Sequence, residues 1–472
     1  MKATNIRRTL AWLLAVCLLT TVLAACSTPD AADPTAAPTQ PTAAPTDPTA
    51  APTDPTAAPT DPTAAPTDPT AAPTEPTAAP TQPPATEPSK PSGGVANIVM
   101  PEPGPDGKFQ ADTQYIFGVG YVEDQMNNRV SVDQAVYIIR SLGVRSVRVW
   151  TGINTLPAEQ WRIDRLHDLI AKLHAADIQV LMFFYGFEFT GGGWMSMPYP
   201  DAAEGSLYRE ALDNFYKKAK FLAEEFPEVR YWEVGNEWNH NPFLHPIEWT
   251  EDGTGAPPFT MYEKARISAD LMNAAMQGLR DGGSNAVVIA PAMAPVDGMD
   301  GVSMSDWLEY LYEIIEKGET VSGSTDPRDY FDALAWHPYL GSAAPDMEWV
   351  ENNNRLYKIA VDHGDAGIKV FLTEAGYNDG GNTRADATQA EWMVKMYELV
   401  RRYMPYVESL HYYRLFTDTS RGADLYGLMH QPEDGFGPKA KALAYQKMAG
   451  GKGDLNKFYM PLYSEGEEPE ED

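Results

Sequence analysis

The stretch VLMFFY at residues 180–185 is the part of the sequence that most restricts the possible folds. Six consecutive apolar side chains cannot alternate between a core and water. A strand formed here must therefore be covered on both faces, as in a parallel sheet. Seven further short apolar runs are also expected to form strands. They lie at residues 115–118, 144–150, 229–234, 286–290, 331–336, 369–373 and 407–413.

Amphipathic stretches with helical periodicity separate these runs. They lie at residues 132–142, 161–176, 207–226, 261–279, 304–316, 349–363 and 389–403, with residues 438–448 as an eighth helix. Strands that alternate with helices predict parallel β/α units. A domain over residues 98–455 has the size of a (β/α)8 TIM barrel, and we predict that α/β fold. A doubly wound open sheet is the alternative, but Glu123 stands where the dinucleotide fingerprint needs its third glycine.

The first 26 residues are typical of an export signal. Basic residues precede a mostly apolar stretch at residues 10–23, which is shorter than the roughly 20 residues of a membrane-spanning helix. The segment closes on LAAC at residues 23–26, which resembles the lipobox of bacterial lipoproteins. The resemblance implies lipid attachment at Cys26, with a plain secretory signal as the alternative. We expect the protein on the extracellular face of the bacterial membrane, held there only by this lipid.

A proline-rich tether follows the signal. From residue 34 to residue 82 the heptapeptide PTAAPT(D/E/Q) repeats seven times. Its only apolar side chains are alanines, and proline removes backbone donors, so the repeats cannot build a core. In an extended polyproline II conformation they reach roughly 150 Å at most, at about 3.1 Å per residue. We predict a disordered linker over residues 27–97 and an acidic solvated tail over residues 456–472.

Cysteine usage and charge exclude several classes of function. Both cysteines, Cys17 and Cys26, lie in the signal segment, so the exported domain has no thiol for disulfides, catalysis or metal binding. The formal net charge of −30 repels nucleic acid, and we expect no such partner. His240 and His245 match no metal-ligand spacing. We expect a monomer that works without a metal or another cofactor.

Two glutamates follow hydrophobic strands at the positions where barrel enzymes carry their catalytic residues, the carboxyl ends of strands. The fourth strand opens into GNE at residues 235–237, and the seventh opens into TEAG at residues 373–376. Strands four and seven lie across a barrel from each other, so Glu237 and Glu374 can face each other over a bound sugar. Retaining glycosidases need two carboxyl groups about 5–5.5 Å apart, one as acid/base and one as nucleophile.

These motifs resemble those of glycoside hydrolase clan A, the superfamily of (β/α)8-barrel retaining glycosidases that includes cellulases and β-xylosidases. The resemblance covers about residues 110–450. It implies that Glu237 is the acid/base and Glu374 the nucleophile of β-glycoside cleavage. It also implies that Arg148 orients the nucleophile and that Asn236 binds the sugar 2-hydroxyl. Residues 337–339 resemble the clan's His-x-Tyr motif, with His337 and with Tyr339 as the hydroxyl that bonds the nucleophile.

Other positions depart from the clan's usual pattern and leave the identity of the sugar open. Trp238 stands where many members have proline, and strand eight ends in Tyr413 in place of a tryptophan platform. Strand three offers Tyr185 and Glu188 in place of a histidine. The aromatic residues expected to contact sugar are Trp194, on a glycine-rich loop after strand three, Trp238 and Tyr413. Glu233, within strand four, is expected to pair with an arginine such as Arg148.

The leading interpretation is a cell-surface glycosidase that cleaves β-glycosidic bonds of a poly- or oligosaccharide by double displacement. A non-catalytic glycan-binding lipoprotein on the same barrel is the alternative, although a binding module has no need of two facing glutamates. An aldolase or lyase would need a Schiff-base lysine or a metal cluster at the strand ends, and the sequence offers neither pattern.

Overall fold

The computed structural model describes residues 115–121, 129–186, 195–250, 252–296, 300–419, 424–431 and 435–458. The predicted signal peptide with Cys26, the linker, Trp194, and the acidic tail beyond residue 458 lie outside the described residues. Across the described ranges, no helix combines the length and the apolar character needed to cross a membrane.

Eight parallel strands close into a barrel in the order β1-β10-β9-β8-β7-β5-β3-β2. They are β1 (Phe117–Tyr121), β2 (Ser146–Trp150), β3 (Gln179–Phe184), β5 (Tyr231–Val234), β7 (Val287–Ile289), β8 (Ala333–Trp336), β9 (Lys369–Ala375) and β10 (Val407–Tyr412). Strand β1 pairs with both β2 and β10, with Gly118 opposite Ser146 and His411. The predicted barrel is therefore confirmed, and the open-sheet alternative is wrong.

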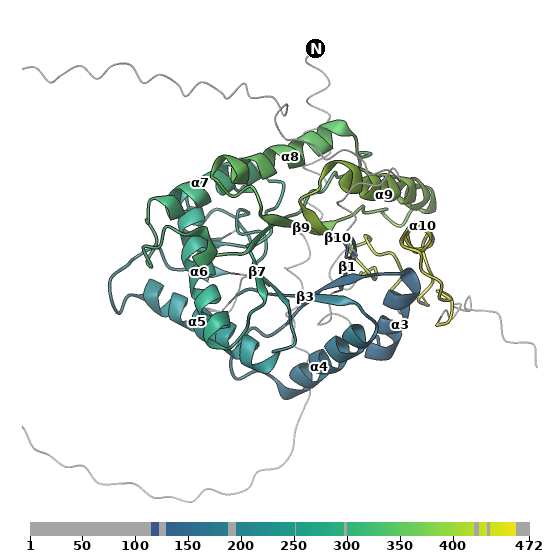
Figure 1. The fold of residues 1–472 in the computed structure, drawn as a ribbon, viewed down its shortest axis with the longest axis horizontal. Coiled ribbons are helices and arrows are strands. Elements are labelled where there is room, and N and C mark those ends of the chain that lie inside the picture. The colour runs from purple at the N-terminus through teal and green to yellow at the C-terminus, as the bar shows by residue number, and fades with distance from the viewer. Residues whose placement is uncertain are drawn as a thin grey trace, which may run out of the picture. The chain divides into compact units, whose positions relative to one another are not determined.

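A helix follows each barrel strand, and the helices surround the strands in the view of Figure 1. They are α3 (Val132–Leu142), α4 (Gln160–Ala175), α5 (Leu207–Glu225), α6 (Met261–Asp281), α7 (Met304–Glu316), α8 (Met347–Asp362), α9 (Thr383–Tyr403) and α10 (Ala440–Ala449). Side-chain caps set several of the starts. Ser131 and Gln134 form a capping box on α3, and Thr260 and Glu263 form one on α6.

Most boundaries lie within two or three residues of the prediction, but α9 begins six residues early. Asn382 caps α9 by accepting hydrogen bonds from the backbone of Arg384 and Ala385. This cap extends the helix over a polar first turn that shows little apolar periodicity. Three short elements were not predicted. The paired strands β4 (Ser196–Met197) and β6 (His245–Pro246) lie in loops after β3 and β5, and a 3-10 turn, η2 (Pro327–Asp329), precedes β8.

Buried apolar residues form two main clusters, one outside the strands and one within the barrel. A large cluster, which includes Trp232 and Leu169, packs between the strands and the helices. A smaller cluster fills the barrel itself, built from Leu181, Ile289, Ala292, Ala333, Ala335 and Phe371. The strands also carry buried polar side chains that belong to neither apolar cluster. Arg148 of β2, Glu233 of β5 and Thr373 of β9 are all buried, and they support the candidate site.

Candidate active site

Arg148 is the centre of the buried polar layer, with 3% of its side chain exposed. Its Nε and Nη2 donate to the two carboxylate oxygens of Glu233 at 2.6 and 2.9 Å. Its Nη1 donates to Glu374 Oε1 at 2.6 Å, and Nη2 also donates to Asn236 Oδ1 at 2.8 Å. The ring of Phe183 lies 3.8 Å from the guanidinium carbon. The expected pairing of Glu233 with Arg148 is confirmed.

Charge compensation holds this arginine in place. Burial lowers the pKa of Arg148, but Glu233 and Glu374 raise it by more, so the pKa lies above its ordinary value. A permanently charged guanidinium therefore bridges a strand-buried carboxylate and a carboxylate at the mouth of the barrel. Its planar fork meets Glu233 with two parallel hydrogen bonds, which a lysine could not do.

Both oxygens of Glu374 have donors. Arg148 donates to Oε1, and the hydroxyl of Tyr339 donates to Oε2 at 2.9 Å. Burial first, and then the charge of Glu374, raises the pKa of Tyr339 well above its ordinary value, so the hydroxyl keeps its proton and remains a donor. Two donors on two different oxygens fix the plane of the carboxylate. This is the arrangement expected of an oriented nucleophile.

The turn that carries Glu237 has a special backbone. Gly235 has φ +91° and Glu237 has φ +51°, the left-handed region that a side chain other than glycine adopts at a cost. A Cβ at Gly235 would lie 2.4 Å from the ring of Trp238, so only glycine fits there. The turn directs Glu237 to the site, where its Oε1 lies 2.7 Å from His337 Nδ1.

Glu237 and His337 share their titration. Burial raises the pKa of Glu237, but His240 and His337 lower it by more, to about 2. Burial lowers the pKa of His337, but Glu374 and Glu237 raise it by more, so that it lies above its ordinary value. These shifts place one proton on the imidazole side of the 2.7 Å bond. The pair as a whole therefore holds a proton that Glu237 alone would lose.

The two glutamates lie close together. An oxygen of Glu237, a ring nitrogen of His337 and an oxygen of Glu374 all lie within 4.8 Å of one another. Inverting enzymes hold their carboxyl groups about 6.5–9.5 Å apart to admit a water, whereas retaining enzymes hold them about 5–5.5 Å apart. The spacing matches the retaining geometry. Arg148, 2.6 Å from Glu374, already supplies the positive charge that a bound cation would otherwise bring.

Three tyrosines line one side of Glu374. Tyr339 and Tyr426 have ring centroids 5.9 Å apart, and Tyr413 lies 5.6 Å from Tyr426. The Tyr413 hydroxyl donates to Asp424, which also accepts from Arg414 at 2.6 Å. Sequence reasoning named Tyr339 and Tyr413 but missed Tyr426. Burial first, and then nearby carboxylates that include both site glutamates, raises the pKa of Tyr426 to about 12.

A second aromatic group lies at the ends of β2 and β3. Trp150 and Tyr185 stack with ring centroids 5.3 Å apart at an interplanar angle of 11°, and Phe183 lies beside Tyr185. These three residues form a cluster separate from both apolar cores. Phe183 also contacts Arg148, so the cluster joins the polar layer of the site. Sequence reasoning noted Tyr185 alone.

The expectation that Trp238 stacks on a sugar is wrong. Only 1% of this side chain is exposed, and its ring packs 6.1 Å from Phe215 of α5. It fills the space that the absent side chain of Gly235 leaves, so neither ring face is open to a ligand. The other tryptophan candidate, Trp194, lies outside the described residues.

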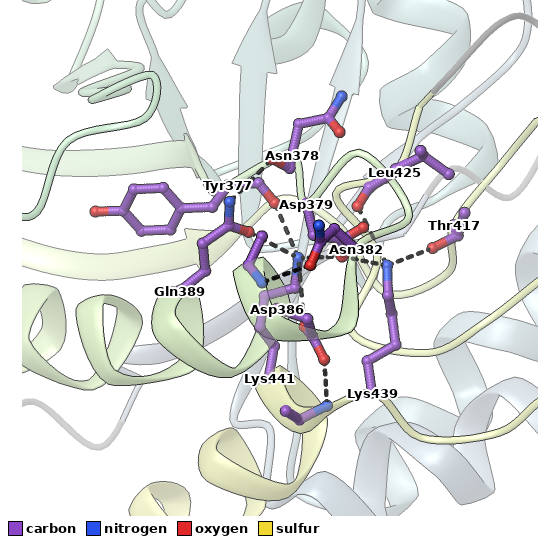
Figure 2. A network of polar contacts seen from close by, with 12 residues as sticks. Tyr377, Asn378, Asp379, Asn382, Asp386, Gln389, Thr417, Leu425, Lys439 and Lys441 are labelled. Carbon is purple, nitrogen blue, oxygen red and sulfur yellow. Dashed lines mark hydrogen bonds and ion pairs between the residues drawn. The ribbon is translucent and has the colours of Figure 1, made fainter.

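A buried ion-pair network joins the loop after β9 to the start of α10 and the residue before it (Figure 2). Asp379, on the loop after β9, accepts from Lys439 at 2.5 Å and from Lys441 at 2.8 Å. Lys441 also donates to the carbonyl of Tyr377 at 2.9 Å, and Lys439 donates to that of Leu425 at 3.3 Å. The network therefore ties the loop that follows Glu374 to the segment that carries Tyr426.

Comparison with solved structures finds glycoside hydrolases. A family 1 β-glucosidase from Thermotoga maritima is 14% identical and has a TM-score of 0.52, with 73% of this chain and 99% of that chain covered. A β-glucosidase from Thermotoga maritima in complex with azafagomine is 14% identical and has a TM-score of 0.51, with 72% of this chain and 98% of that chain covered. A family 39 glycoside hydrolase from the gut symbiont Bacteroides cellulosilyticus WH2 is 15% identical, with a TM-score of 0.47.

The match to the family 39 enzyme covers 72% of this chain but only 64% of that chain, slightly less than two thirds of its length. No protein-family profile and no curated protein matches the sequence. At such identities the β-glucosidase likeness is a likeness of fold, and the expected resemblance to glycoside hydrolases is confirmed at that level.

Proposed function

We propose that this chain is a retaining glycosidase that cleaves β-glycosidic bonds by double displacement, with Glu237 as acid/base and Glu374 as nucleophile. The observation that carries the proposal is the approach of the two carboxylates to within 4.8 Å at the ends of opposite strands. The glycoside hydrolase fold supports it, and so does the difference between the two environments. Glu374 is held by Arg148 and Tyr339, whereas Glu237 faces a histidine that can share a proton.

The reaction has two balanced steps. In the first, a carboxylate oxygen of Glu374 attacks the anomeric carbon, the glycosidic bond breaks, and the proton of the Glu237 pair passes to the leaving oxygen. In the second, Glu237 takes a proton from water, the water oxygen attacks the same carbon, and Glu374 leaves as a carboxylate. Two inversions give net retention of configuration. Asn236, held by Arg148 at 2.8 Å, is the candidate to bind the sugar 2-hydroxyl.

Replacing each glutamate with glutamine tests the roles. Glu374→Gln removes the nucleophile, and turnover of aryl β-glycosides should fall by several orders of magnitude. Glu237→Gln should lose about 10²–10⁴-fold on substrates with poor leaving groups and much less on dinitrophenyl glycosides, which leave without protonation. Glu391→Gln, at an exposed position of α9, is the matched control. Unchanged rates in both site variants would refute the proposal. Glycan binding by the wild type without product release would favour the binding-module alternative.

Azide distinguishes the two roles directly. In Glu237→Ala the glycosyl-enzyme forms from an activated substrate, and azide can displace Glu374 without a general base, which gives a glycosyl azide of retained β configuration. In Glu374→Ala azide takes the place of the nucleophile and gives the inverted α product. The product configurations are read by proton NMR. If the two variants exchange these products, the assignment is reversed.

We also propose that the protein acts at the cell surface as a monomer anchored only through lipidated Cys26. The sequence LAAC at residues 23–26 and the repeats of residues 34–82 support this proposal. Cys26→Ala should move the protein from the membrane fraction to the medium, whereas Cys17→Ala, in the same segment, should leave it in the membrane fraction. Membrane retention of Cys26→Ala would refute the anchor, and a dimer in light scattering of the exported domain would refute the monomer.

A further inference from the structure

A line of hydrogen bonds runs from Glu237 into the barrel. His337 is fully buried, with Nδ1 2.7 Å from Glu237 Oε1 and Nε2 3.2 Å from the hydroxyl of Thr373. The Thr373 hydroxyl donates in turn to Glu233 Oε1 at 3.2 Å. Arg148 then joins Glu233 to Glu374. The two site glutamates are thus linked through β8, β9, β5 and β2.

Which group donates in each hydrogen bond of this line follows from Glu233, the residue at the inner end of the line. Glu233 is fully buried and accepts from Arg148 through both oxygens, so it can act only as an acceptor. A threonine hydroxyl has a single proton, and Thr373 must give it to Glu233. Only lone pairs of Thr373 then face His337. The proton of a neutral His337 must therefore sit on Nε2, where it has an acceptor, and Nδ1 is left with a lone pair.

We propose that Thr373 and Glu233 are positioning residues that hold His337 in the Nε2–H form and thereby keep the acid proton on the Glu237–His337 pair. This inference rests on the proposed role of Glu237 as acid/base. With the proton present, the 2.7 Å bond joins either a carboxylic acid to an imidazole or a carboxylate to an imidazolium. Without it, a carboxylate oxygen faces the Nδ1 lone pair across the same distance, which is repulsive.

This arrangement serves both steps of the proposed reaction. Before glycosylation, loss of the proton would leave the Glu237 carboxylate facing the Nδ1 lone pair of His337. This repulsion keeps the proton on the pair, and from there it can move to Glu237 and on to the leaving oxygen. After glycosylation Glu237 faces the Nδ1 lone pair, which makes it a stronger base toward the incoming water. The proton removed from water then reloads the pair. One tautomer thus supports the acid role and the base role in turn.

Several charged groups face His337, and Thr373 changes none of them. Glu237 of the β5 turn lies at 2.7 Å, Glu374 Oε2 of β9 lies 3.8 Å from Nδ1, and Arg148 of β2 opposes the two carboxylates. The ring of Tyr339, two residues along the chain, lies edge-on at 6.1 Å. Removal of a neutral hydroxyl leaves these charges in place. A change in titration on removal of this hydroxyl therefore reports the lost hydrogen bond.

The test is the alkaline limb of the kcat/KM profile in Thr373→Val. Without the hydroxyl, a neutral His337 can carry its proton on Nδ1 and donate it to the Glu237 carboxylate, which stabilises the deprotonated state. The alkaline limb should move down by about one pH unit, the scale of one hydrogen bond to a charged group. Thr373→Ser should restore the wild-type limb. Thr320→Val is the control. It also removes a buried hydroxyl, but Thr320 follows α7 and bonds Tyr330 and not His337, so the alkaline limb of the kcat/KM profile should not move.

The tautomer can also be read without activity. In wild-type protein labelled with ¹⁵N-histidine, above the alkaline limb, the His337 resonances should show the Nε2–H form, with the assignment made by their loss in His337→Gln. An Nδ1–H form in the wild type would overturn the inference, even if Thr373→Val failed to fold. An unshifted limb in a folded, active Thr373→Val would also overturn it. Both results leave the proposed function standing, because that function is tested separately by the activities of Glu237→Gln and Glu374→Gln.

Discussion

Replacing Arg148 with methionine should separate its structural role from its catalytic role. The change removes the guanidinium that donates to Glu233, to Glu374 and to Asn236. Glu233 is fully buried and would keep only the Thr373 hydroxyl as a described donor. Removal of one partner from a buried ion pair costs about 3–5 kcal/mol, because the other charge remains uncompensated. For a large domain, at roughly 2 °C per kcal/mol, this corresponds to a Tm about 6–10 °C lower.

A second substitution should recover stability but not activity. In Arg148→Met/Glu233→Leu no orphaned charge remains within the barrel, and apolar replacements of buried pairs are commonly neutral or stabilising. We expect the double variant to regain most of the lost Tm. Glu374 still lacks the donor that lies 2.6 Å from Oε1 in the wild type, so kcat should stay as low as in Arg148→Met. Thermal or urea unfolding, together with turnover of an aryl β-glycoside, measures both quantities.

Two outcomes would contradict this reasoning. If Arg148→Met unfolds at the wild-type temperature, the buried pair does not stabilise the barrel in the way its geometry implies. If the double variant regains wild-type turnover, Arg148 acts only by neutralising Glu233, and its contact with Glu374 is unimportant. Arg148→Lys provides the matched control, because it keeps the charge but cannot reach two carboxylates with a planar fork. Its stability should lie between those of the wild type and Arg148→Met.

Three further predictions concern the surroundings of the site. Gly235→Ala places a Cβ 2.4 Å from Trp238 at φ +91°, and should cost about 2–4 kcal/mol in thermal unfolding and reduce kcat; an unaltered melting curve would contradict it. Tyr339→Phe removes the 2.9 Å bond to Glu374 and should lower kcat about tenfold or more with the Tm nearly unchanged, so full activity would argue against its orienting role. Asp379→Asn removes the carboxylate that pairs with Lys439 and Lys441, leaves Lys441 with Asp386 at 3.7 Å, and should destabilise the protein by about 3–5 kcal/mol at pH 7. Burial raises the pKa of Asp379, but Lys439 and Lys441 lower it by more, so the folded pKa lies below the ordinary value of about 3.9. The contribution of Asp379 to the free energy of unfolding is therefore fully present above about pH 3.9 and is lost as pH falls through the folded pKa. In urea titrations the difference between wild type and Asp379→Asn should therefore shrink below about pH 4; a constant difference would be inconsistent with this linkage.

The barrel could be predicted because its parallel strands must be apolar on both faces. A strand formed by a run such as residues 180–185 must be covered on both faces, and helical periodicity marks the segments between such runs. The pairing of Glu233 with Arg148 was also predictable, since a carboxylate inside a strand needs a buried cation. The early start of α9 was missed because the cap at Asn382 depends on a side chain and not on periodicity.

The failure at Trp238 has a specific backbone cause. Trp238 was expected to contact sugar because it directly follows Glu237 in the sequence. The backbone is left-handed at Gly235 and Glu237, and the ring of Trp238 packs against Phe215 of α5 instead of lining the site. Tyr426 was missed for another reason. It follows β10 in an irregular segment, and the buried ion pairs that hold this segment join residues more than fifty positions apart.

The two glutamates share a chemical type and a site, so only their neighbours can give them different roles. Glu374 meets a guanidinium whose charge is permanent and a phenol that keeps its proton, and each donates a hydrogen bond to one of its two oxygens. Glu237 meets an imidazole, whose Nδ1 can take up a proton and return it. Because the pKa of His337 is raised, the Glu237 pair should stay loaded to a pH above about 6.5, the ordinary value for histidine, and release its proton only when a leaving oxygen accepts it. A permanent partner suits a nucleophile and a titrating partner suits an acid/base, and this difference supports the proposed roles independently of any sequence motif.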